Sequence, residues 1–194
     1  MTTPFTSPFT TSPFTTSTAS AAQQETPSAR FGGLPLPRGL REDAENMPWS
    51  TFTATYSPSS GPLRLAAFGC TDTDRPSTRL GPQPRTYAAT FAIGDRVERA
   101  TVTSSGPVDA LIAMLFDCGI FLDMFRFHQL ESRDQTATFI QGGDGQHLEW
   151  AMGLADDKTE SALRAVIACA NRLMRVAWYA EIDHAAKKYT WRRR

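Results

Sequence analysis

The sequence predicts an α+β fold made of two successive βββα units, with antiparallel sheets packed against helices. Short stretches that alternate apolar and polar residues, or that are rich in β-branched and aromatic residues, are typical of strands. Two longer stretches, one in each half, carry apolar residues at helical spacing. Because two similar units follow each other, we expect a pseudo-twofold axis between them.

Residues 1–48 are predicted to be a disordered tail. A four-residue unit, Thr-Thr/Ser-Pro-Phe, recurs from Thr2, Thr6 and Thr11, and proline at this density opposes helices and central strands. The tail is either simply solvated or a phenylalanine-bearing docking segment for a partner. We place the folded domain at residues 49–180 and a basic tail at residues 181–194, which is either a frayed end or an anchor for an acidic partner.

The first half of the domain reads as strands followed by one helix. Strands are expected at residues 51–56, 61–69, 85–93 and 96–104, and Gly94-Asp95 suits a type II′ hairpin turn. Pro107 fits the first position of a helix, Ser105 or Gly106 its N-cap, and Gly119 its end. One helical face carries the apolar residues Val108, Leu111, Ile112, Leu115 and Phe116.

The second half repeats this order. Strands are expected at residues 121–129, 135–141 and 147–153, with a turn at residues 142–145. A long helix follows within residues 156–181, where Asp157 and Glu160 have capping-box spacing.

Composition narrows the function. Lys+Arg and Asp+Glu are both 20, so net charge supports neither a nucleic-acid partner nor a membrane surface. The three cysteines are far apart in sequence, which favours a reducing, cytoplasmic location over a disulfide framework. No run of about 18 apolar residues predicts a membrane span, and the N-terminus lacks the features of a secretory signal. The histidines are isolated, so we expect no metal, no cofactor and no catalytic residues.

The start of the first helix is the candidate binding site. A helix N-terminus offers free N–H groups to a carboxylate, and Gly106 would allow close backbone approach. Asp109 is placed to receive an ammonium group, while Val108, Phe127 and Leu154 could line an apolar pocket. Ser105 completes the predicted set. The alternative is that these residues merely begin a helix.

Three stretches carry a family resemblance: "SSGPVDAL", "SRDQTATFIQ" and "WAMGLADDKTESALRAVIACANR". In this order they resemble the C-terminal regulatory domain of 2-isopropylmalate synthase, most densely over residues 100–175. The resemblance implies two βββα units, a homodimer, and feedback binding of leucine, or of isoleucine in related enzymes. It also implies that catalysis belongs to a separate (β/α)8 barrel, so this chain is expected to act on a catalytic synthase subunit. The competing hypotheses are a structural interaction module without a ligand and an enzyme in its own right.

Overall fold

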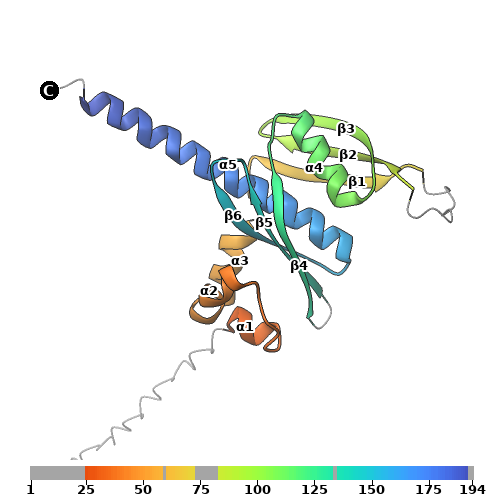
Figure 1. Ribbon diagram of the computed structural model, residues 1–194, viewed down its shortest axis with the longest axis horizontal. Helices are drawn as coiled ribbons and strands as arrows, with labels where there is room; N and C mark the ends of the chain where they lie inside the picture. Colours follow the sequence, from red (N-terminus) through yellow and green to blue (C-terminus); the bar gives the residue numbers. More distant parts are fainter. Residues whose placement is uncertain (1–24, 59, 73–82, 133–134, 192–194) are drawn as a thin grey trace, which may run out of the picture.

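Two three-stranded antiparallel sheets hold all the strands of the described chain (Figure 1). The computed structural model describes residues 25–58, 60–72, 83–132 and 135–191, with side chains as far as Trp178. One sheet has the order β1-β2-β3 and the other β4-β5-β6, and a helix follows each set of three strands. The predicted α+β fold with two βββα units is confirmed.

The first unit contains β1 (Leu63–Cys70), β2 (Arg85–Ile93), β3 (Arg96–Ser104) and α4 (Pro107–Asp117). The bounds of β2 and β3 are those expected from the alternation, and Gly94 takes a φ of 60° in the turn between them. The register of β1 on β2 shifts between Leu65 and Ala67, which indicates a bulge in this edge strand.

Both ends of α4 follow from local sequence. Gly106 is the N-cap and Pro107 occupies the first turn, where a missing N–H is harmless. At the other end Gly119 takes a φ of 82°. The N–H of Ile120 bonds the Leu115 carbonyl and the N–H of Gly119 bonds the Phe116 carbonyl, which together form a Schellman motif.

The second unit contains β4 (Asp123–Ser132), β5 (Gln135–Gly143), β6 (Leu148–Ala155) and α5 (Lys158–Trp191). Asp157 Oδ1 accepts the N–H of Glu160 at 2.8 Å, so half of the predicted capping box is present. The Glu160 carboxylate instead pairs with Arg164 one turn later.

Helix α5 lies directly on β6 because Gly153 has no side chain. A Cβ at Gly153 would stand 2.1 Å from the Ser161 carbonyl oxygen and 2.4 Å from the Ala165 nitrogen. The Ser161 hydroxyl donates to the Gly153 carbonyl at 2.9 Å and lies 2.7 Å from the Thr138 hydroxyl. Gly153, which ends the quoted sequence WAMG, therefore sets the distance between helix and sheet.

The expectation of a disordered tail is wrong for residues 25–48. This part of the chain forms α1 (Pro27–Arg30), the 3-10 helix η1 (Arg38–Leu40) and α2 (Arg41–Asn46), and it lies against the sheet of the second unit (Figure 1). Phe31, Leu36, Leu40 and Ala44 are buried in one cluster with Phe139 and Met152. Burial of these side chains on a sheet face offsets the ordering entropy that argued for disorder. Residues 1–24, which carry the Thr/Ser-Pro-Phe repeats, lie outside the described residues.

The expected strand at residues 51–56 is instead the helix α3 (Trp49–Tyr56). The hydroxyls of Thr53 and Thr55 donate to carbonyls one turn earlier, at 3.0 and 2.8 Å, so these β-branched residues are accommodated in a helix. Phe52 and Tyr56 are buried and, with Trp49, follow helical spacing. Packing on the sheet therefore outweighs the β-propensity of the threonines.

The expectation that a separate tail begins at residue 181 also differs from the structure, because the backbone of α5 continues as a helix to Trp191. The C-terminal part of α5 extends beyond both sheets (Figure 1). Within the described residues, no helix has the combination of length and apolar character that crossing a bilayer requires.

Candidate functional site between the two units

The start of α4 is held by its own side chains. The Ser105 hydroxyl donates to Asp109 Oδ2 at 2.9 Å, and the Gly106 carbonyl accepts the N–H of Ala110. Gly106 has a φ of −159°, which any residue can adopt, and an added Cβ would meet only Asp109 Oδ2, at 4.0 Å. Nothing within the described chain therefore requires glycine here.

A cavity of about 630 Å³ lies between the two units beside this helix start. One wall is the edge strand β1, from Leu65 to Cys70, together with Tyr87, whose ring stacks on Phe68. Pro107 brings the start of α4 to the cavity, and residues Asp157 to Arg164 bring the start of α5. Both helix starts, which occupy corresponding places in the two units, thus meet at one cavity.

The polar groups of this cavity carry both signs of charge. Arg164 Nη2 pairs with Glu160 Oε1 at 2.5 Å, and Arg164 Nη1 donates to the Leu154 carbonyl at 2.6 Å. Asp157 caps α5, while Leu65 and Leu163 supply apolar surface. Such a site offers a guanidinium to a carboxylate, carboxylates to an ammonium, and apolar contacts to a hydrocarbon side chain.

The predicted site residues are not all brought together. Ser105, Gly106, Val108 and Asp109 flank Pro107 in sequence, but none of them lines the cavity. Phe127 is 46% exposed on β4, and Leu154 packs against the N-terminal cluster. The strand register puts the side chains of Phe127 and Leu154 on opposite faces of their sheet. Phe127 pairs with Ile140, which is buried in the core between the two units, whereas Leu154 pairs with Ala137, which is buried with the N-terminal helices. A single pocket within one chain cannot contain both.

Sequence reasoning missed Arg164 and the wall formed by β1. Arg164 could have been predicted from the sequence, because the start of α5 corresponds to the start of α4 in the other unit. A candidate site at one helix start suggests that the residues at the other should be considered too. The β1 wall had no such signal, since only the tertiary arrangement brings an edge strand across two helix starts.

The Asn-Arg pair of the long helix has a structural role. Asn171 accepts the N–H of Leu63 at 2.9 Å and donates to its carbonyl at 2.8 Å, which ties β1 to α5. Arg172 bonds Glu149 at 2.5 and 3.0 Å and the Thr55 carbonyl, and its guanidinium lies 4.9 Å from the Tyr56 ring centre. These two residues therefore fasten both β1 and the N-terminal helices to α5.

The titratable groups of the described chain include two with strongly raised pKa values. Burial, with a hydrogen bond to Asp43, raises the pKa of Tyr56 to about 12, and burial raises the pKa of the Cys169 thiol to about 12. Burial works against ionisation of Asp144, but backbone N–H groups of His147 and Gln146 lower its pKa. No three His, Cys, Asp or Glu side chains meet at a metal-sized site in the part of the chain described.

Comparison with known proteins agrees with the resemblance seen in the sequence. No protein-family model matches the chain. The 2-isopropylmalate synthase of Arthrobacter sp. (strain FB24) is 28% identical over 139 residues, which cover 66% of this chain and 23% of that enzyme. The 2-isopropylmalate synthase of Leifsonia xyli subsp. xyli is 28% identical over 142 residues, covering 70% of this chain and 24% of the enzyme.

A third enzyme of this name, from Kocuria rhizophila, is 25% identical over 146 residues and again is matched over only 24% of its length. The chain thus spans about a quarter of the length of the curated relatives it matches. Two βββα units account for most of the described residues. By sequence, therefore, this chain is similar to one part of 2-isopropylmalate synthases, about a quarter of their length.

Proposed function

We propose that the chain is an amino-acid-binding regulatory domain, and that its ligand is leucine or a near relative such as isoleucine. The observation that carries the proposal is the cavity at which the two helix starts meet. In this proposal Arg164 binds the ligand carboxylate, and Asp157 or Glu160 binds its ammonium group. Leu65 and Leu163 contact the branched side chain. The start of α4, residues 105–109, forms the adjoining rim.

The role of the chain in this proposal is binding rather than catalysis. The described residues contain two βββα units, and the charged groups of the cavity already pair with one another. The similarity to synthases over a quarter of their length supports a part of such an enzyme that acts on a catalytic synthase subunit and thereby regulates leucine biosynthesis. Neither nucleic acid nor membrane is a partner in this proposal.

The proposal includes a homodimer. Phe116 and Phe121 make an edge-to-face contact at 5.1 Å, and both are more than half exposed. Phe125 and Phe127 on β4 are exposed as well. Large exposed aromatic side chains of this kind support burial in a subunit interface. Phe127, which lies outside the cavity of its own chain, is then available to a second copy.

A thermal-shift series with all free amino acids tests ligand binding. A ligand that binds only the folded protein at one hundred times its Kd stabilises it by about 2.7 kcal/mol. Leucine or a near relative should raise the melting temperature most, and Arg164→Gln should abolish the shift. Gly106→Val tests whether the start of α4, residues 105–109, contributes to ligand binding. The backbone at Gly106 accepts valine, and the added side chain would project into open space without disturbing the fold. The exposed hairpin variant Asp95→Asn is the matched control.

If no amino acid raises the melting temperature, the binding proposal fails, and the alternative of an interaction module without a ligand takes its place. Light scattering tests the dimer separately and should give twice the mass of one chain. A particle of single-chain mass at high concentration would contradict the dimer.

A further inference from the structure

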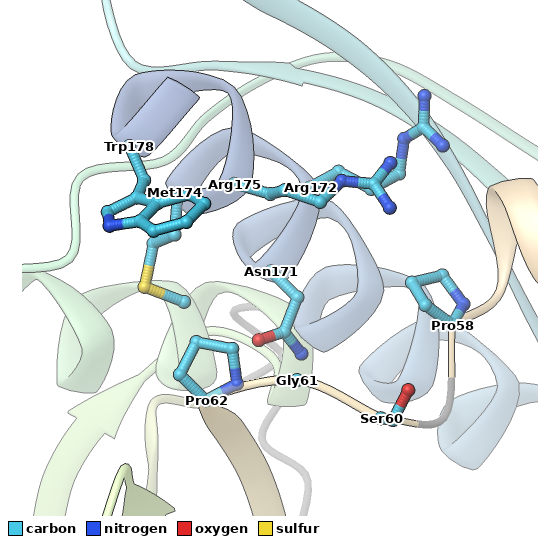
Figure 2. A pocket seen from close by; sticks show the side chains of 9 residues that line it. All are labelled: Pro58, Ser60, Gly61, Pro62, Asn171, Arg172, Met174, Arg175 and Trp178. Carbon is cyan, nitrogen blue, oxygen red and sulfur yellow. The ribbon is translucent and has the colours of Figure 1, made fainter. Parts of the chain in front are cut away.

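A second cavity, of about 420 Å³, lies where Pro58 and residues 60–62 face the α5 residues Asn171 to Trp178 (Figure 2). Its apolar walls are Pro58, Pro62, Met174 and Trp178. Figure 2 shows the Trp178 indole and Met174 at one end of the cavity and Pro58 at the other, with Asn171 between them. The volume is in the range of sites for small organic molecules.

The floor of this cavity is preformed. The amide of Asn171 is 6% exposed and uses both its oxygen and its nitrogen on the backbone of Leu63, at 2.9 and 2.8 Å. These groups are therefore already occupied, and they hold Leu63, which directly follows the lining residues 60–62, against the helix. A ligand entering the cavity meets little reorganisation of its floor.

The charge of the cavity is positive. Arg172 is neutralised by Glu149, whose Oε2 lies 2.5 Å from its Nη2. Arg175 is exposed and has no acidic partner among the ion pairs of the described residues. None of the described residues that line the cavity is an aspartate or a glutamate. Among the described lining residues, the guanidinium of Arg175 thus has no acidic partner, and it borders a mostly apolar cavity.

We propose that this cavity binds a small carboxylic acid with an apolar, aromatic-sized body. Arg175 pairs with the carboxylate, and the body lies among Trp178, Met174 and the two prolines. A free amino acid is disfavoured, because its ammonium group would find no carboxylate among the described residues that line the cavity. The site is therefore distinct in chemistry and position from the cavity between the two units, and it does not depend on leucine binding.

The test compares 4-phenylbutyrate with the neutral 4-phenylbutan-1-ol by isothermal titration of the full chain. We expect saturable binding of one phenylbutyrate per chain, with the alcohol about fivefold weaker, which is the contribution of one exposed ion pair. Arg175→Gln should remove this preference while leaving alcohol binding unchanged. Trp178→Ala should weaken both compounds about tenfold, through loss of apolar contact.

The control variant is Arg96→Gln, because Arg96 is an exposed arginine in the hairpin between β2 and β3. It should bind phenylbutyrate and the alcohol as the unaltered protein does. Equal affinity for acid and alcohol, a retained preference in Arg175→Gln, or no saturable binding would each overturn the proposal. Displacement of phenylbutyrate by an equal concentration of leucine would also overturn it. If Trp178→Ala fails to fold, the Arg175→Gln result alone tests the proposal, because Arg175→Gln removes only an exposed charge.

Discussion

Replacement of Asn171 by alanine should destabilise the fold more than any surface change on the same helix. The asparagine side chain substitutes for a strand neighbour: it accepts the N–H of Leu63 and donates to its carbonyl. Leu63 is fully buried at the start of β1, and it belongs to the core between the two units. The variant Asn171→Ala leaves both backbone groups without a partner.

The magnitude follows from the number of orphaned groups. A buried donor or acceptor left without a partner costs about 1–3 kcal/mol, so two such groups cost about 2–6 kcal/mol. Asn171 borders the 420 Å³ cavity, so water can reach part of the vacated space and reduce this cost. We therefore expect a loss of about 2–3 kcal/mol in the free energy of unfolding.

Urea denaturation at 25 °C, followed by circular dichroism, measures this loss. Arg175→Gln is the matched control, because that residue is exposed one turn further along and should change stability by no more than about 0.5 kcal/mol. Asn171→Asp should also be destabilising, because a carboxylate can accept from the Leu63 N–H but cannot donate to its carbonyl. If Asn171→Ala unfolds within about 0.5 kcal/mol of the unaltered protein, the amide does not anchor β1.

Three further predictions follow from the packing and the buried groups. Gly153→Ala should lower the free energy of unfolding in urea by at least about 3 kcal/mol, because the added Cβ would lie 2.1 Å from the Ser161 carbonyl oxygen. An unfolding midpoint close to that of the unaltered protein would contradict the close approach of α5 to β6. Cys169, with a pKa raised to about 12 by burial, should resist iodoacetamide at pH 8 until the protein unfolds, whereas the partly exposed Cys70 should react in the folded state, as peptide mapping would show. Tyr56 has a pKa of about 12 in the folded protein, above its unfolded value, so its contribution to stability is complete below pH 10 and is lost as the pH rises toward 12. Tyr56→Phe should therefore reduce the fall of melting temperature with pH between pH 10 and 12. The same slope in the variant and in the unaltered protein would contradict this prediction.

Elements whose signals are local were predicted correctly from the sequence. The alternation in residues 85–93 and 96–104 predicted β2 and β3 with their bounds, because side chains on a strand point alternately to its two faces. Pro107 and Gly119 marked the ends of α4, because proline suits a first turn and glycine accepts the positive φ of a helix end. The similarity to part of 2-isopropylmalate synthases was likewise visible in short motifs.

The contacts between distant elements, by contrast, could not be predicted from local sequence. Residues 25–48 are ordered because Phe31 and Leu40 are buried on a sheet face, and no local signal in a Pro-rich stretch predicts such a surface. Pairing with β5 separated Phe127 from Leu154, because their partners Ile140 and Ala137 are three positions apart on that strand and so point to opposite faces. The candidate binding cavity lies where β1 crosses two helix starts from different halves of the chain, and burial and close packing, acting over long sequence separations, bring those segments together.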